Sequence, residues 1–132
     1  MKAQELRVGN WVSITPFGKN NDIQINEKEF ADLIIFKTFH RIEPIPLTEE
    51  WLLNFGFVGN YHKHFQVENE HYFIYLTLSD NNEKFIVDLR NYYDYPDNMS
   101  DYDSINLPLY CQHVHQLQNI YYSLTGEELC TK

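Results

Sequence analysis

The chain has 132 residues and a formal net charge of −9, from ten Lys and Arg side chains against nineteen Asp and Glu. This length fits a single compact domain, with two halves at 1–47 and 48–132 as a second reading. The acidic balance works against attraction to phosphate backbones and anionic lipid, so direct nucleic-acid binding is not expected. No apolar run approaches the roughly 20 residues of a membrane span, and cytoplasm is the expected location.

The first 47 residues predict a small, strongly bent β unit of SH3-like appearance. Alternation in ELRVGNWVSI, Glu5 to Ile14, predicts a strand after a turn at Gly9 and Asn10. The β-branched IQI at Ile23 to Ile25 predicts a second strand.

A short helix is expected next, followed by a third strand. Asn26 with Glu29 three residues on is a capping-box pattern, and it predicts a helix over about Glu27 to Leu33. The apolar run IIFKTFHRI, Ile34 to Ile42, then predicts a strand that two prolines end.

The segment IPLTEEWLLNFGF carries both a start and a stop signal for a two-turn helix. Thr48 is a good N-cap, and Leu47 with Leu52 forms a hydrophobic staple. Gly56 at the position after the C-cap lets Phe57 contact Leu52 in a Schellman motif. The side chains expected to point inward are Trp51, Leu52 and Phe55.

From Tyr61 to Asn91 the pattern alternates with period two and predicts a three-stranded antiparallel meander with one apolar face. The expected cross-strand pairs are Val67 with Tyr72, Phe65 with Ile74, Leu78 with Phe85, Leu76 with Val87, and Ile74 with Leu89. The opposite face should hold His62, His64, Gln66, Tyr75, Lys84, Asp88 and Arg90.

The segment VHQLQNIYYSLTGEEL, Val114 to Leu129, predicts an amphipathic helix that Gly126 ends and that covers the meander. The covering band is formed by Tyr110, Val114, Leu117, Tyr121 and Leu124, widened by His113 and Ile120. The residues expected to face away are Gln112, Gln116, Asn119 and Ser123. The expected fold is therefore α+β: the N-terminal β unit, the short linking helix, and the meander under the C-terminal helix.

A polar stretch, residues 91–108, separates the meander from that helix, and Ser104 to Asn106 could add an edge strand. Tyrosine offers a large contact area plus a hydroxyl at low entropic cost, so this stretch is the best candidate for partner recognition. Folding of these tyrosines back onto the sheet is an equally good alternative. The candidate residues are Tyr92, Tyr93, Asp94, Tyr95, Asp101, Tyr102 and Asp103. Residues 91–132 hold six acidic side chains and one basic. Such an acidic surface is typical of solvated charge that keeps a protein soluble, and the alternative is a docking face for a basic partner.

Neither a catalytic site nor a cofactor site is predicted. Cys111 and His115 would be neighbours at i and i+4 on one helix, which makes them the one conceivable thiol–imidazole dyad. With His62 and His64 they could complete a metal tetrahedron, but the sheet would separate the two pairs. Cys111 and Cys130 are predicted to be thiols. The aspartate spacing in the tyrosine-rich stretch does not match a calcium-binding EF-hand.

Three segments, ELRVGNWV at Glu5 to Val12, IPLTEEWLLNFGF at Ile45 to Phe57, and VHQLQNIYYSLTGEEL at Val114 to Leu129, resemble a family of small proteins. Its members are encoded in phages and mobile elements of Bacteroides-like bacteria and have no assigned activity. The resemblance implies a mobile-element context and no particular site residue. The expected function is a non-catalytic protein-binding module. The alternatives are an acidic nucleic-acid mimic that inhibits a DNA-binding host protein, and a small thiol or metal-dependent enzyme.

Overall fold

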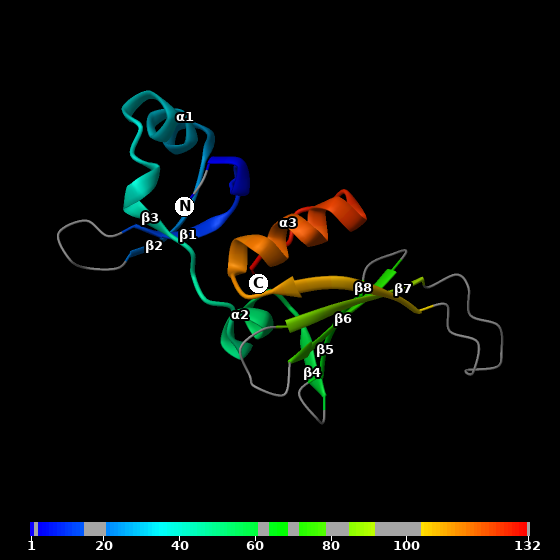
Figure 1. The fold of residues 1–132 in the computed structure, drawn as a ribbon. Helices are drawn as coiled ribbons and strands as arrows, with labels where there is room; N and C mark the ends of the chain where they lie inside the picture. Colours follow the sequence, from blue (N-terminus) through cyan, green and yellow to red (C-terminus); the bar gives the residue numbers. More distant parts are fainter. Residues whose placement is uncertain are drawn as a thin grey trace, which may run out of the picture. The chain divides into compact units, whose positions relative to one another are not determined.

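The computed structural model describes residues 1, 3–14, 21–60, 64–68, 72–78, 85–91 and 104–131, and it confirms a mixed α+β protein (Figure 1). The chain forms two compact units. The first unit joins Met1–Pro46 to His113–Glu128, and the second joins Leu47–Gln112 to Leu129–Lys132. The C-terminal helix therefore belongs with the N-terminal residues, whereas the sequence predicted that it would belong with the meander.

The first unit contains a three-stranded antiparallel sheet of order β2-β1-β3, formed by β1 (Trp11–Ile14), β2 (Asn21–Gln24) and β3 (Ile42–Glu43). A short 3-10 helix, η1 (Ala3–Glu5), precedes β1. The two predicted strands that end at Ile14 and begin near Ile23 are confirmed as β1 and β2. Its buried core consists of Leu6, Val12, Ile25 and Ile42, and half-buried Met1, Ile14, Ile23, Phe30, Leu33 and Phe39 pack against them.

Helix α1 (Glu27–Phe36) begins with the predicted capping box. The Glu29 N–H donates to Asn26 Oδ1 at 2.8 Å, and the Asn26 N–H donates to Glu29 Oε2 at 3.0 Å. The helix continues to Phe36 and ends at Lys37, whose φ of 52° is left-handed.

The predicted strand over Ile34 to Ile42 is wrong. Its first three residues form the last turn of α1, Phe39–Arg41 form the 3-10 helix η2, and only Ile42 enters a strand. A short apolar run fits either a helix or a strand, and here the capped helix upstream simply extends into it.

In the second unit, α2 (Glu49–Asn54) has both of its predicted ends. The Trp51 N–H donates to Thr48 Oγ1 at 3.4 Å. At the other end the Phe57 N–H donates to the Leu52 carbonyl and the Gly56 N–H to the Leu53 carbonyl, both at 3.0 Å, which is the Schellman pattern. Leu52 and Phe55 are buried as predicted, and Trp51 is half-buried.

The second unit is built on a five-stranded antiparallel sheet of order β4-β5-β6-β7-β8. Its strands are β4 (Val58–Asn60), β5 (His64–Glu68), β6 (Tyr72–Leu78), β7 (Phe85–Asn91) and β8 (Ser104–Cys111). The predicted meander corresponds to β5, β6 and β7, and β4 and β8 extend it on either side.

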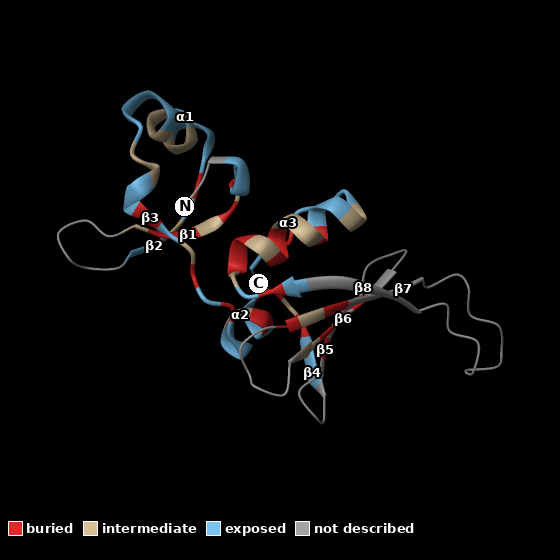
Figure 2. Cartoon of the chain, in the orientation of Figure 1, coloured by how far each residue is buried: buried red, intermediate tan, exposed pale blue. Residues whose placement is uncertain are grey.

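The register of β6 with β7 is confirmed at all three predicted pairs, but the register of β5 with β6 is shifted by two residues. Phe65 lies opposite Leu76 and Val67 opposite Ile74. A two-residue shift leaves every side chain on its original face, because the side-chain period of a strand is two. The apolar face is accordingly buried as expected, at Phe65, Ile74, Leu76, Phe85 and Val87 (Figure 2).

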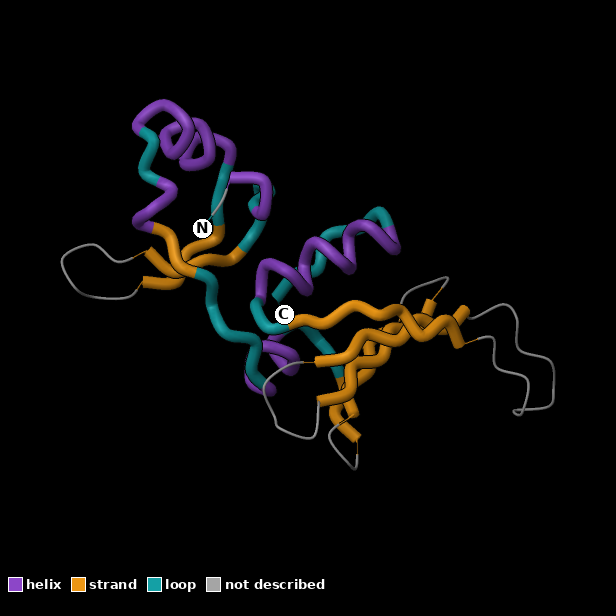
Figure 3. The backbone as a smooth tube through the Cα atoms, in the orientation of Figure 1, coloured by secondary structure: helices purple, strands orange, loops and turns teal. Residues whose placement is uncertain are grey.

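Strand β8 is longer than the predicted Ser104 to Asn106 and runs on to Cys111. It therefore includes Tyr110, which the sequence assigned to the C-terminal helix. Pro108 is tolerated there because β8 is the last strand of its sheet, beside a register irregularity between Ile86 and Asp88 of β7. Figure 3 shows this long strand leading into the final helix, α3 (Val114–Thr125).

Candidate functional site

Helix α3 begins at His113, where the backbone N–H donates to Gln116 Oε1 at 3.1 Å, and ends at Gly126 with a φ of 74°. Its buried residues include the predicted Val114, Leu117 and Tyr121. They also include His115 and Gln118, which the sequence did not assign to the interior. The most connected polar cluster among the described residues lies on this side of the helix.

One half of that cluster is the turn at Arg7–Asn10. The Asn10 N–H donates to the Arg7 carbonyl at 3.1 Å, and the Arg7 N–H donates to Asn10 Oδ1 at 2.7 Å. Gly9 has a φ of 95°, the left-handed value that favours glycine at this turn position. The turn fixes the Asn10 side chain, which is fully buried.

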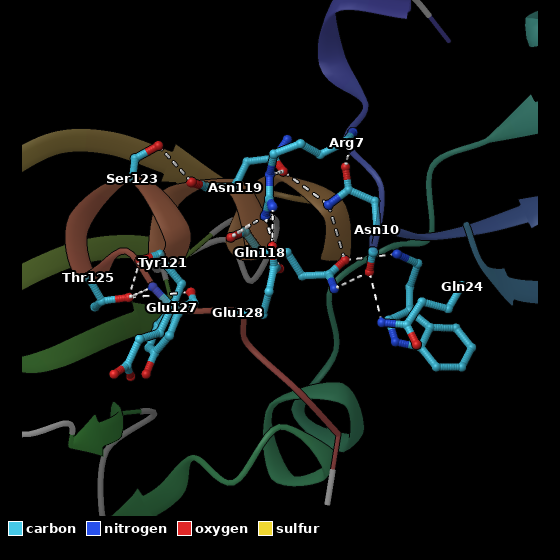
Figure 4. A network of polar contacts seen from close by, with 12 residues as sticks. Arg7, Asn10, Gln24, Gln118, Asn119, Tyr121, Ser123, Thr125, Glu127 and Glu128 are labelled. Carbon is cyan, nitrogen blue, oxygen red and sulfur yellow. Dashed lines mark hydrogen bonds and ion pairs between the residues drawn. The ribbon is translucent and has the colours of Figure 1, made fainter. Parts of the chain in front are cut away.

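The other half is Gln118 of α3. Its side-chain amide bonds to the backbone around the start of β1, as a neighbouring strand would (Figure 4). Its Oε1 accepts from the Trp11 N–H at 2.8 Å, and its Nε2 donates to the Gly9 carbonyl at 3.0 Å. A side-chain amide has the same donor and acceptor pair as a peptide unit, so one glutamine satisfies two buried backbone groups.

Asn119 extends the cluster to Arg7. Its Oδ1 accepts from Asn10 Nδ2 at 3.0 Å and from Arg7 Nε at 3.1 Å, while its Nδ2 donates to the Glu5 carbonyl at 3.0 Å. The Arg7 guanidinium also pairs with Glu128 and lies 4.2 Å from the centre of the Tyr122 ring. The prediction that Asn119 faces away from the packed side is wrong for this reason.

The amides of Asn10, Gln118 and Asn119 use both their oxygen and their nitrogen within this cluster. Amides that are bonded on both sides hold the backbone segments that they connect in one arrangement. The cluster therefore joins α3 to the N-terminal residues.

Among the described residues, His115 is the one buried histidine whose protonation the structure penalises. Its side chain is 3% exposed, and its Nδ1 has no hydrogen-bond partner among the described residues. The His113 ring stacks on it, with centroids 5.8 Å apart. Burial and the neighbouring His113 lower the pKa of His115 below its ordinary 6.5, and Glu5 opposes the shift.

The predicted proximity of Cys111 and His115 on one helix is wrong, because Cys111 ends β8 and His115 lies in α3. Cys111 and Cys130 are both thiols, as predicted. Within the described residues no group of three or more His, Cys, Asp or Glu side chains is placed to hold a metal ion.

The predicted recognition residues lie outside the described part of the chain, and so does His62. They are Tyr92, Tyr93, Asp94, Tyr95, Asp101, Tyr102 and Asp103. Their role stays a prediction.

A surface that the sequence did not predict lies at the end of α1. Ile34, Ile35 and Phe36 are 54%, 68% and 69% exposed, and no residue of α1 is buried. Lys37 and Arg41, which follow in the chain, are exposed as well. The apolar run was visible in the sequence, but its interpretation as a strand hid the exposure.

Comparisons of the chain with protein-family models, with curated proteins and with solved structures give no match. Among the helices that the structure describes, none has the length and apolar character to cross a membrane.

Proposed function

We propose that the chain is a non-catalytic protein-binding module of a phage or mobile element. The observation that carries the binding function is the exposed apolar run Ile34–Phe36 at the end of α1. Contiguous large apolar side chains on a surface mark sites of protein association, because their burial against a partner removes them from water. The mobile-element setting rests on the resemblance of three sequence segments.

Two further observations favour binding over catalysis. The buried amides of Asn10 and Gln118 and the half-buried amide of Asn119 bond to one another and to the N-terminal backbone, which holds α3. The thiol of Cys111 and the imidazole of His115 belong to different secondary-structure elements, so the helical spacing that suggested a dyad does not exist. The tyrosine-rich stretch, 92–103, is proposed as a second contact surface, suited to a basic partner.

Affinity capture from the native host, with the full chain as bait, tests this function. We expect a specific host or phage protein to be retained. Alanine at Tyr92, Tyr93, Tyr95 and Tyr102 together should reduce its capture without changing the circular dichroism spectrum. Capture of no protein above a bead control would overturn the proposed function. Competition by DNA with strong salt dependence would instead favour the acidic nucleic-acid mimic.

A further inference from the structure

The last turn of α1 exposes three large apolar side chains in succession. Half-buried Phe30 and Leu33 pack against the core, and they are the side chains that hold the helix in place. Ile34, Ile35 and Phe36 come next, and all three are exposed. Three consecutive helical residues cover about 200° of the helix circumference, so this end of α1 presents apolar surface on several sides.

Exposed basic residues follow this apolar turn in the sequence. Lys37 caps α1, and His40 and Arg41 belong to η2. The Phe39 ring of η2 contacts the Phe30 ring of α1 edge-on, with centroids 6.3 Å apart, which folds η2 back beside the helix. Neither Lys37 nor Arg41 forms an ion pair with any described residue.

The charged side chains between Asp32 and Glu43 are both basic. Residues 33–42 contain two Lys or Arg side chains and no Asp or Glu, whereas the chain as a whole has a net charge of −9. We call Ile34, Ile35, Phe36, Lys37, His40 and Arg41 the α1 tip. It combines an apolar contact surface with positive charge that pairs with no carboxylate in the described part of the chain.

We propose that the α1 tip binds an acidic peptide segment of a partner protein, a segment that also carries apolar side chains. This inference rests on the proposed protein-binding function and specifies its partner. The apolar side chains of the segment cover Ile34–Phe36, and its carboxylates pair with Lys37 and Arg41. Such charge complementarity speeds association and excludes basic competitors.

A peptide fits better than a nucleic acid or an anionic membrane. Charges interact over about 8 Å at physiological ionic strength, so a short segment senses mainly the cations of the tip. A polyanionic surface extends over many such lengths and meets the acidic remainder of the protein. It is therefore repelled where a short acidic segment is attracted.

Site-specific photo-crosslinking tests the location and the chemistry together. A photoreactive residue replaces Ile35 in the full chain, which is irradiated in host lysate, and the crosslinked peptides are sequenced by mass spectrometry. We expect peptides with net negative charge that contain Leu, Ile, Val or Phe. Basic peptides, lipid or nucleic acid at this position would overturn the proposal, and so would the absence of any crosslink.

A direct binding measurement uses two labelled synthetic probes: a short peptide of Glu, Leu and Phe, and a counterpart in which Lys replaces every Glu. We expect the acidic probe alone to bind, with an affinity that falls as salt is added. Equal or stronger binding of the basic probe would overturn the proposal.

Matched variants then locate the acidic probe on the protein. Lys37→Asn with Arg41→Gln should weaken its binding about tenfold or more, the loss typical of a significant contact. Asn tolerates the left-handed backbone at position 37, so the helix end is retained. Lys28→Gln, at an exposed position in the first turn of α1, is the charge control. An equal loss in the control would overturn the assignment to the tip.

Phe36→Ser should also weaken binding of the acidic probe about tenfold or more. The control is Leu53→Ser, which changes an exposed apolar residue on α2.

Failure of the proposed α1 tip site is distinguishable from failure of the proposed protein-binding function. If the intact chain captures a protein that crosslinks only from positions outside the α1 tip, protein binding stands and this surface assignment is wrong.

Discussion

Helices α3 and α1 belong to the same unit, yet they are held in it in different ways. Helix α3 contributes the fully buried Gln118, which bonds to the backbone at Gly9 and Trp11, on the two sides of Asn10. Helix α1 has no buried residue and packs through half-buried Phe30 and Leu33. The difference indicates that α3 is fixed by directional hydrogen bonds, whereas the end of α1 remains available for contact.

Among the variants that compare α3 with α1, Gln118→Leu is expected to lower the free energy of unfolding most. The change removes the acceptor of the Trp11 N–H and one donor to the Gly9 carbonyl. We expect a loss of about 2–3 kcal/mol in the free energy of unfolding, since buried backbone groups lose their partners. Urea unfolding of Gln118→Leu in a Trp51→Phe background, followed by tryptophan fluorescence, measures this loss. The fluorescence then comes from Trp11 alone, which lies in the first unit.

The control for Gln118 is Gln24, an exposed glutamine that donates to the same Gly9 carbonyl at 3.0 Å. Gln24→Ala should cost no more than about 0.5 kcal/mol, because water can replace an exposed amide. Equal losses of unfolding free energy for Gln118→Leu and Gln24→Ala would show that the buried bonds of Gln118 hold α3 no more strongly than an exposed glutamine would.

A smaller effect is expected from Arg7→Lys, which retains the charge but not the guanidinium geometry. Bonds from Arg7 to Asn119 Oδ1 and to the Gln118 carbonyl are lost, and the contact over Tyr122 is weakened. We expect about 1–2 kcal/mol of destabilisation in the same unfolding assay.

Glu128→Gln removes the negative charge that pairs with the exposed side of the Arg7 guanidinium but leaves the guanidinium itself unchanged. Its cost should stay below about 1 kcal/mol and shrink with added salt. A larger loss for Glu128→Gln than for Arg7→Lys would show that the ion pair, and not the hydrogen bonds, fixes α3.

The pH dependence of stability offers a third test of how α3 is attached. The pKa of His115 is lowered in the folded state, so the unfolded state binds more protons in the window from 6.5 down to the lowered pKa. Stability of the first unit should be fully present above 6.5 and fall as the pH decreases through that window. Unfolding experiments at a series of pH values, monitored by Trp11, measure the slope.

His115→Leu should flatten this slope, because the titrating group is gone. His40→Gln is the control, since His40 is exposed and lies in η2. Retention of the full slope in His115→Leu would assign the acid sensitivity to other groups.

The smallest effect is expected at the end of α1. Ile35→Ser should change the free energy of unfolding by no more than about 0.5 kcal/mol, because the side chain is already 68% exposed. The same urea assay measures it. A loss comparable to that of Gln118→Leu would mean that the last turn of α1 supports the fold and is not a free contact surface.

The sequence predicted those parts of the fold that neighbouring residues determine. The caps at Asn26, Thr48, Gly56 and Gly126 depend on bonds within a few residues, and all four are confirmed. The alternating pattern also predicted which side chains of the meander are buried. Its exact pairing was harder to predict, because a two-residue shift in β5 keeps the same face inward.

Long-range polar contacts could not be predicted. A helical wheel ranks residues by hydrophobicity, so it placed Asn119 outside and gave no reason to place Gln118 inside. Their partners, Trp11 and Asn10, lie more than a hundred positions away in the sequence. The same wheel assigned Tyr110 to α3, although β8 includes it, because an apolar residue before a helix fits either element.

The backbone at Ile45 and Val114 closes the first unit, since the Val114 N–H donates to the Ile45 carbonyl at 2.9 Å and Pro46 forms a β-bridge with His113. The chain therefore leaves the first unit before residue 47 and returns to it after residue 112 at the same place, which is the arrangement of an inserted domain. The first unit is complete only with α3, which follows residues 47–112 in the sequence. Replacing 47–112 by a short turn should thus preserve the first unit, whereas truncation before His113 removes α3 and with it the bonds from Gln118 to Trp11 and Gly9.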